Sequence, residues 1–192
     1  MLLISKWSFG LCAALLMSSA AADVRLIDQR RFGDWVTARQ IDDNGNLKAC
    51  FASISPISGA VVGTEQIVIS TSAHNLIPNL DKGMMRTMFI VNITGVRDTS
   101  NDFTGELAVY LGNKDNGMLL VLLYKTLRAS DGVQNLVVVL SHRLLEALRK
   151  YQSMAIDLPL LGAGDALVFG LNGASQALDH YEDCFEQVRE TM

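Results

Sequence analysis

The sequence predicts a mainly β fold: an antiparallel β-sandwich of about eight or nine strands, with two short helices in the C-terminal third. Three observations support this fold class. Short apolar segments alternate with Asn-Gly and Asp-Gly turns, the connections between them are short, and a helical period occurs only late in the chain. Residues 23–192 are long enough for one domain with its own hydrophobic core, and we expect a single domain there.

The clearest predicted hairpin joins residues 106–111 to residues 118–124 through a turn at 112–117 that contains Asn116-Gly117. The first arm alternates apolar and more polar positions, as a half-buried strand does. The second arm is apolar on both faces, which predicts a central position in a sheet.

Two further hairpins and three single strands follow from the same signals. The hairpins join 34–39 to 47–55 and 154–161 to 166–171, and the single strands are 66–71, 86–93 and 135–140. Residues 57–66 and 94–105 are expected to be surface loops. The connections between these segments are too short to contain the crossover helices of an alternating βαβ fold.

The two predicted helices have amphipathic spacing. The first covers about 142–150 with Ser141 as its N-cap, and the second begins near Gly173 with Asn172 or Ser175 as its cap. Apolar residues recur at three- and four-residue spacing in the second helix, at Ala174, Ala177, Leu178, Tyr181, Phe185 and Val188. Cys184 lies on that same face, so the packing side of the helix also carries the cysteine.

Residues 1–22 have the pattern of a cleaved signal peptide. Lys6 supplies a positive charge, residues 9–17 are apolar, and Ala20-Ala21-Ala22 precedes Asp23 as an A-x-A cleavage site. The alternative is a retained N-terminal anchor, but the apolar run is shorter than the roughly 20 residues that span a bilayer. We therefore expect a periplasmic or secreted protein without stable membrane insertion after cleavage near Ala22.

Cleavage removes Cys12 and leaves Cys50 and Cys184. Two cysteines in an oxidising compartment are expected to pair as a structural disulfide. The alternative is a redox dithiol, but such motifs place the two thiols close in sequence, as in C-x-x-C. The expected disulfide would fasten the second helix to the strand that carries Cys50.

No catalytic constellation is visible in the sequence, and we expect neither an enzyme nor a cofactor. The chain has no G-x-S-x-G nucleophile motif. The three histidines lack metal-ligand spacing, and we expect His142 and His180 to be solvated and His74 to lie in a loop. A net charge of −4 without a Lys/Arg cluster argues against nucleic acid as a partner.

Two motifs suggest a metal at first sight. The turn that begins at Asp42 is acidic, but position twelve is Ser53 rather than the bidentate Glu of a calcium loop, so we interpret it as a hairpin turn. Met84, Met85 and Met88 could offer thioethers to Cu(I), yet a strand would separate them onto two faces. Core packing is the preferred interpretation, and no metal site is predicted.

Two separated stretches together resemble the invasion-associated locus B family of bacterial exported proteins. The opening Phe32-Gly33-Asp34-Trp35-Val36, followed by Ala49-Cys50-Phe51, is similar to the family's F-G-D-W…C pattern. The closing part is similar as well, from 144–150 through Phe169-Gly170-Leu171-Asn172-Gly173 to Cys184. The middle of the chain, about 56–135, does not take part, and Ala38-Arg39 stand where the family often has a further cysteine.

The resemblance implies an envelope-associated β-sandwich without a known catalytic centre. It transfers no functional residues: Trp35, Cys50 and Cys184 correspond to structural positions, with Trp35 as a core anchor. We therefore expect a non-enzymatic protein that contacts another envelope or exported protein. The alternative is a periplasmic module that binds a small molecule or an envelope polymer through a concave sheet face or its loops.

Overall fold

The computed structural model describes residues 25–57, 66–70, 88–94, 104–113, 116–128, 133–139, 141–157 and 166–190. The predicted signal peptide, His74, Met84 and Met85 lie outside these residues, as do the side chain of Met88 and most of the two predicted loops. Within the described part of the chain, no helix is long and apolar enough to cross a membrane.

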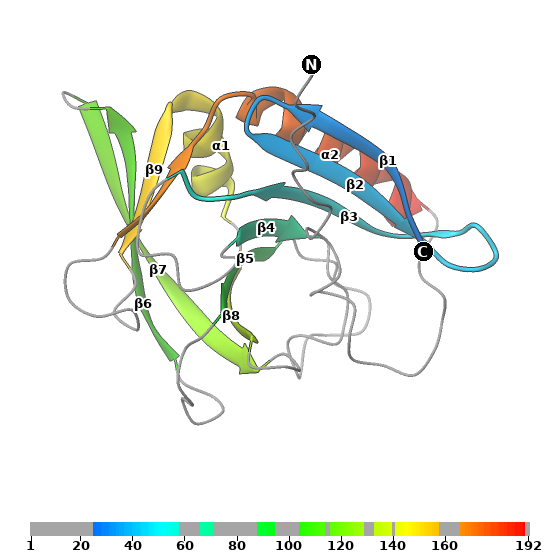
Figure 1. Ribbon diagram of the computed structural model, residues 1–192, viewed down its shortest axis with the longest axis horizontal. Coiled ribbons are helices and arrows are strands. Elements are labelled where there is room, and N and C mark those ends of the chain that lie inside the picture. The colour runs from blue at the N-terminus through cyan, green and yellow to red at the C-terminus, as the bar shows by residue number, and fades with distance from the viewer. Residues whose placement is uncertain are drawn as a thin grey trace, which may run out of the picture.

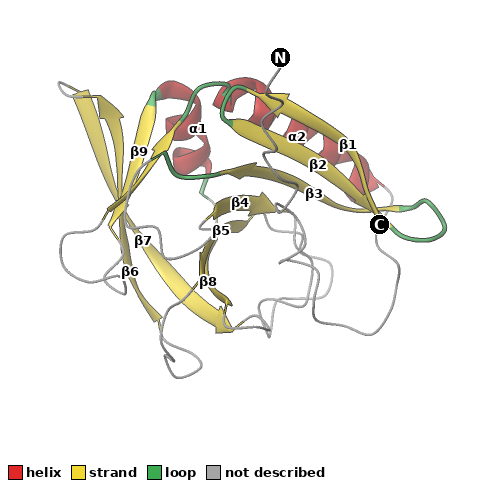
Figure 2. Cartoon of the chain, viewed as in Figure 1, coloured by secondary structure: helices red, strands yellow, loops and turns green. Residues whose placement is uncertain are grey.

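Ten strands and two helices make up the described structure, and the predicted mainly β antiparallel class with two C-terminal helices is confirmed (Figures 1 and 2). The strands are β1 (Arg25–Phe32), β2 (Trp35–Ile41), β3 (Leu47–Ile54), β4 (Gln66–Ser70), β5 (Met88–Thr94), β6 (Thr104–Asn113), β7 (Asn116–Arg128), β8 (Val133–Val139), β9 (Ser153–Asp157) and β10 (Ala166–Gly170). The helices are α1 (His142–Lys150) and α2 (Ala174–Glu190). The strand that the sequence analysis missed is β1.

All ten strands are hydrogen-bonded in the order β1-β2-β3-β4-β5-β8-β7-β6-β9-β10, and every neighbouring pair is antiparallel. The sheet curls, so that Ile57, just after β3, donates a backbone hydrogen bond to Val168 of β10 at 2.7 Å. The layers of the sandwich-like fold are thus produced by the curling of one sheet, which resembles a half-barrel.

The first helix, α1, begins where its capping residue predicts. The Ser141 side chain accepts a hydrogen bond from the Leu144 backbone N–H at 3.2 Å. Leu144, Ala147 and Leu148 are buried. Arg149, in the last turn, contacts Asp179 and Glu182 of α2 at 2.7 and 2.9 Å and so joins the two helices.

The second helix, α2, lies across β1, β2 and β3 (Figure 1). Its buried positions follow the predicted spacing and are Ala174, Ala177, Leu178, Tyr181, Cys184 and Val188. Cys184 is bonded to Cys50 of β3 with a Cα–Cα distance of 6.0 Å, as the sequence predicts, and both residues are buried. Trp35 of β2 has no exposed surface, which fits its expected role in the core.

Two glycine turns interlock beside the start of β2. The Asp34 backbone N–H donates to the carbonyl oxygen of Asn172 at 3.0 Å, and Gly33 and Gly173 both have positive φ, +58° and +81°. A Cβ on Gly33 would overlap the Asn172 carbonyl, and one on Gly173 would overlap the Phe32 carbonyl. The two stretches that carry the family resemblance therefore meet in space, and their glycines are required by backbone packing.

Candidate functional site

A polar cluster joins β1, β2 and α2 through His180. The Thr37 hydroxyl lies 3.0 Å from His180 Nδ1, and Asp28 Oδ2 lies 3.3 Å from His180 Nε2. The Phe32 ring packs against the imidazole at a centroid distance of 5.7 Å. His180 was expected to be solvated, and that expectation is wrong, because only 10% of its side chain is exposed.

The carboxylate of Asp28 is the centre of this cluster. Arg30 Nε donates to Asp28 Oδ1 at 2.8 Å. Arg39 Nε and His180 Nε2 lie 3.2 and 3.3 Å from Oδ2, within ion-pair distance but outside hydrogen-bond geometry. The hydrogen bond from Arg30, together with the charges of Arg30, Arg39 and His180, holds the pKa of Asp28 below its usual value.

The chain of contacts from Thr37 through His180 to Asp28 resembles the nucleophile, base and acid of a catalytic triad, but its geometry is that of a structural contact. Thr37 is only 1% exposed, so a substrate carbonyl has no path to its hydroxyl. Asp28 has a φ of +48° at an irregularity in the β1–β2 register, and the cluster holds this backbone against α2. Sequence reasoning missed these contacts because it did not identify β1.

The turn after Asp42 is stabilised by its own residues, as the hairpin interpretation predicts. Asp42 Oδ1 accepts from the backbone N–H groups of Asn44 and Asn46 at 3.0 and 2.9 Å, and Lys48 Nζ lies 3.1 Å from Oδ2. The hydrogen bonds from Asn46, with a contribution from Lys48, lower the pKa of Asp42 to about 2. Across the described residues, no three His, Cys, Asp or Glu side chains converge as metal ligands. His142 is 85% exposed, as predicted, 3.1 Å from Glu146.

An exposed apolar surface covers the opposite half of the sheet, on the β6–β7 hairpin. Tyr110 of β6 is 49% exposed, and Leu119, Val121 and Leu123 of β7 are 53%, 57% and 76% exposed. Tyr110 pairs directly with Leu119 in the strand register. The other face of β6 is buried, at Leu107, Val109 and Leu111.

This surface continues across the neighbouring strands. Tyr110 is also paired with Ala155 of β9, Ala155 with Val168 of β10, and Val168 with the backbone of Ile57, whose side chain is 66% exposed. We call these residues, with Leu119, Val121 and Leu123, the apolar face. Directly opposite residues of an antiparallel pair share one face of the sheet, so the row is continuous.

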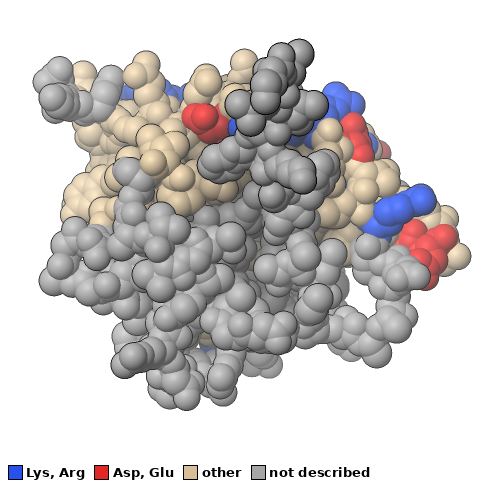
Figure 3. Space-filling model, in the orientation of Figure 1, with Lys and Arg blue, Asp and Glu red and all other residues tan. Residues whose placement is uncertain are grey.

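Charged groups surround the apolar face rather than crossing it. Glu106, paired with Leu123, and Asp157, paired with Ala108, are exposed, and Lys125 follows Leu123 on the same side of β7. On the face seen in Figure 3, the charged side chains of the described residues gather mainly at the β1–β3 side, whereas the described surface at the β9 side is largely uncharged. Contiguous exposed apolar surface of this kind is typical of an interaction site.

The sequence predicted the position of β7 but not its exposure. In the strand order β7 lies between β8 and β6, but β8 pairs only with Lys125–Arg128, whereas residues 118–124, the arm predicted to be central, pair with β6. A central strand with two apolar faces is normally covered on both sides, yet the Leu119, Val121 and Leu123 side remains open to solvent. The unexplained second apolar face was therefore the available signal for this site.

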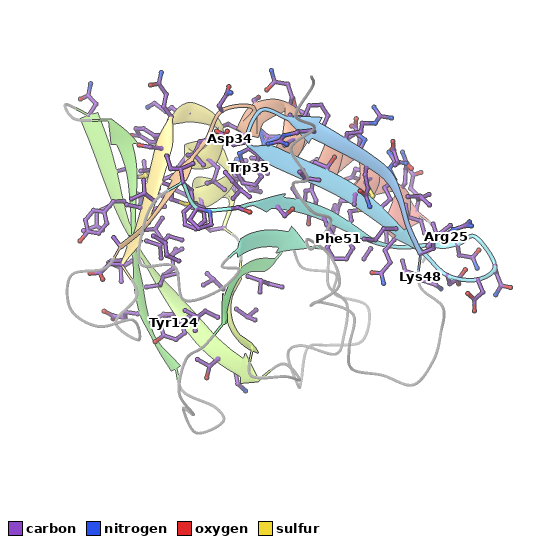
Figure 4. The ribbon with its side chains drawn as sticks, in the orientation of Figure 1. Arg25, Asp34, Trp35, Lys48, Phe51 and Tyr124 are labelled. Atoms are coloured by element: carbon purple, nitrogen blue, oxygen red, sulfur yellow. A yellow bond between two sulfur atoms is a disulfide. The ribbon has the colours of Figure 1, made fainter. Side chains whose placement is uncertain are left out.

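The residues highlighted by sequence lie elsewhere. Trp35 begins β2, directly after Asp34 (Figure 4), and Cys50 and Cys184 join β3 to α2. Tyr124, which the sequence does not highlight, lies on β7 next to Leu123 but is 3% exposed, and burial raises the pKa of its hydroxyl. Compared with known proteins, the chain matches no family model, no curated protein and no solved structure.

Proposed function

We propose that this is a non-enzymatic exported protein that acts in the bacterial envelope through protein–protein contacts made by the apolar face. The observation that carries the proposal is the exposure of Tyr110, Leu119, Val121 and Leu123 on two adjacent strands. Complete burial of a side chain of this size stabilises a complex by about 1.5–3 kcal/mol. Four neighbouring side chains can therefore supply the centre of an interface, and Tyr110 adds an aromatic ring with a polar end.

A protein partner fits this surface better than a lipid surface. Glu106 and Asp157 lie exposed at its margin, and the whole chain carries a net charge of −4. Anionic membrane surfaces attract Lys and Arg and repel such carboxylates. Aliphatic and aromatic side chains in the centre with charges at the margin correspond to the usual anatomy of a protein–protein interface.

Export is supported by the cysteines and by the sequence of the N-terminus. The Cys50–Cys184 bond is of a kind that persists in oxidising compartments, and residues 1–22 have the features of a signal peptide. The test is N-terminal sequencing of the protein recovered from the periplasm or medium. We expect the mature chain to begin at Asp23, whereas an intact N-terminus in the cytoplasmic fraction would contradict export.

Membership of the invasion-associated locus B family is also part of the proposal. The two stretches that resemble the family contact each other at Gly33 and Gly173, next to Trp35. This contact supports the interpretation that the two stretches form one structural unit. Because the motif residues contact each other, we propose that recognition uses other parts of the surface. We therefore do not place the function on the motif residues.

Site-specific photocrosslinking in the producing cells tests the contact surface. A photoreactive residue is placed at Val121 or Leu123, with controls at Arg31 on β1 and His142 on α1, both of which are exposed. We expect a discrete crosslinked product from the two β7 positions and none from the controls. Equal yields at all four positions, or no product from β7, would contradict the proposal.

A further inference from the structure

We propose that an extended segment of a different exported protein pairs with the open edge of β7 and adds a strand to the sheet. The open edge is residues 117–123, on the side of β7 that faces away from β6. This inference rests on the proposed function, because it specifies how the partner binds beside the apolar face. It follows from the strand pairing and from the residues along the edge.

The open edge begins where β8 leaves β7. β8 pairs with Lys125–Arg128 only, although β7 starts at Asn116. On its other side β7 pairs with β6 from Asn116 to Lys125. Within the described residues, no third strand is paired with β7. Residues 117–123 therefore have a described neighbouring strand on one side only.

The strand register shows which backbone groups point out of the open edge. The Gly112 carbonyl accepts a hydrogen bond from the Ser153 hydroxyl of β9, so it points away from β7. Successive residues of an antiparallel strand direct their N–H and C=O groups to alternate sides. Every second residue of β6, from Gly112 back to Glu106, therefore points away from β7, and its register partner on β7 points away from β6. These partners are Gly117, Leu119, Val121 and Leu123.

The open edge lacks the features that protect the other two edges of the sheet. Natural sheets protect their edges with charged residues, prolines, register irregularities or covering segments. In β1 half of the residues are charged and the register is irregular near Asp28, and the Val168 carbonyl of β10 accepts a hydrogen bond from Ile57. Met118–Leu123 contains only apolar residues, and its register with β6 is regular. An edge of this kind is suited to a strand from outside the chain.

An extended chain is the partner that matches this edge. The outward N–H and C=O groups recur at every second residue, about 7 Å apart, which is also their spacing along another strand. A helix uses its backbone groups internally and cannot pair with them. On the exposed face the added strand lies beside Leu119, Val121 and Leu123. On the other face it lies beside Met118 and Leu122, which are partly buried. The added segment is therefore apolar at alternate positions.

Glu106 indicates the charge of the partner. It is exposed and pairs with Leu123, so it lies one strand behind the open edge. A residue added opposite Leu123 is two strand spacings from Glu106, about 10 Å, which a long Lys or Arg side chain leaning toward the carboxylate covers. The open edge itself carries no charge between Gly117 and Leu123. The added segment is therefore basic at this end.

A second copy of this chain fits the edge less well than a segment of another protein. A two-fold pairing of two β7 edges that includes Leu119, Val121 and Leu123 brings the hairpin end of each copy to Lys125 of the other. That place is already taken, because β8 pairs with Lys125 through Val137. An extended segment of another protein can end before this point.

NMR spectroscopy of the mature exported protein tests the inference with a synthetic peptide. The peptide Lys-Thr-Val-Thr-Val-Thr-Lys, with blocked ends, matches residues 117–123 in length and carries its valines and lysines on one face. In the free protein the amides of Leu119, Val121 and Leu123 should exchange rapidly with solvent. At a peptide concentration of about ten times Kd, their exchange should slow by about tenfold. A peptide with Glu at both ends should bind about threefold more weakly.

Methylation of the peptide backbone separates strand pairing from general stickiness. N-methyl groups at alternate residues remove the donors from one of the two edges of the peptide. We expect one alternate set to abolish binding and the other to preserve it, and the sensitive set reports the direction of the added strand. The inference is overturned if the unmodified peptide does not bind at millimolar concentrations, if the two methylated sets behave alike, or if the Glu peptide binds equally well.

Photocrosslinking in cells distinguishes this inference from the proposed function. A photoreactive residue at Leu123 is compared in wild type, Val121→Pro and Val121→Thr. Proline removes an outward N–H, whereas threonine keeps it together with a β-branched shape, so the product should be lost with proline and retained with threonine. Thermal unfolding confirms that each variant is folded, and the peptide series decides the inference without any variant.

Each crosslinking outcome has a separate meaning. A product that persists in the Val121→Pro variant overturns strand pairing and leaves the proposed function standing, with contacts made by side chains alone. A product formed by two copies of this chain overturns the assignment of a different protein. If the wild type gives no product, the proposed function is wrong, and the inference that rests on it is wrong as well.

Discussion

The two halves of this molecule differ in whether their distinctive residues face the protein interior or the solvent. In the half formed by β1–β3 and α2, the residues of the recognisable motifs are engaged in internal contacts: the glycine turns interlock, and Cys50 is bonded to Cys184. Asp28, which belongs to no motif, also makes internal contacts, because it binds Arg30 and faces His180. The β6–β7 half has a recognisable hairpin turn but takes no part in the family resemblance, yet its large apolar side chains face solvent. A distinctive motif can therefore be wholly structural, while the surface that we propose for recognition lies outside the motifs.

The difference is also one of charge. Around α2, cations and anions are paired across elements, as in the contact of Arg149 with Asp179 and Glu182. Such exposed pairs contribute little individually, but here they join separate elements at several points. On the apolar face the only described charges stand at the margin. Its apolar side chains therefore contribute burial free energy only when another surface covers them.

Removal of the disulfide should have the largest effect on the first half. The bond closes a loop with a sequence separation of 134, and in the chain-entropy description we expect Cys50→Ser or Cys184→Ser to lower the free energy of unfolding by about 4 kcal/mol. Chemical denaturation of the oxidised wild type and the variants measures this. The double variant should be no less stable than either single one, since both remove the same bond. A loss confined to one of the two single variants would contradict the disulfide.

Substitutions in the interlocked glycine turns should have the second-largest effect on the free energy of unfolding. Gly33→Ala or Gly173→Ala forces a Cβ into a backbone carbonyl in addition to disfavouring the positive φ, and we expect a loss of about 2–3 kcal/mol. The matched control is Gly45→Ala, because Gly45 also has positive φ, +81°, but a Cβ there meets no atom within 4 Å. Its expected loss is about 1 kcal/mol. Equal losses at all three positions would show that the turns do not interlock.

The Asp28 contacts should have a smaller and pH-dependent effect. Because the folded pKa of Asp28 lies below its ordinary value, its contribution is present above the unfolded pKa and is lost as the pH falls through the folded value. Asp28→Asn tolerates the positive φ but removes the charge, and we expect a loss of roughly 1 kcal/mol at neutral pH. Hydrogen exchange should locate the loss in β1. The two pH values to compare are 2 and 7, which lie about two units below and about three units above the ordinary Asp pKa. If the difference in the free energy of unfolding between wild type and variant is as large at pH 2 as at pH 7, the ion-pair explanation is wrong.

Substitutions on the apolar face should have the smallest effect on stability. Leu123→Gln removes a side chain that is 76% exposed, so we expect the free energy of unfolding of the monomer to change by less than about 0.5 kcal/mol. The matched control is Leu107→Ala on the buried face of the neighbouring strand β6, where we expect a loss of about 2–5 kcal/mol. Comparable losses at the two positions would mean that the face is covered in the monomer.

Most of the architecture follows from local sequence signals. The Asn-Gly and Asp42 turns, the Ser141 cap and the helical spacing of Ala177, Tyr181 and Cys184 place the hairpins and helices close to where they are found. The missed strand β1 has no fully buried residue, and half of its eight residues are charged, because an edge strand needs little apolar pattern and is held by contacts distant in sequence. The same limit applies to His180, whose burial depends on Thr37 and Asp28, far away in the chain.

The candidate site was harder to predict for a different reason. An apolar side chain in a strand has the same sequence signal whether the protein's own core or a partner covers it. Which face of the hairpin remains open is shown only by the core, in which the buried residues of β6, β9 and β10 join those of α1 and α2.

The central claim is that the apolar face, and not the motif-rich half, carries the function. Crosslinking from a photoreactive residue at Val121 tests it most directly when the yield is compared in three backgrounds: wild type, Leu119→Asn/Leu123→Asn, and Asp28→Asn. The account predicts that the product is lost in the Leu119/Leu123 variant, which keeps its folded stability, and is retained in the Asp28 variant, which is less stable. A product that persists in the Leu119/Leu123 variant and disappears in the Asp28 variant would contradict it.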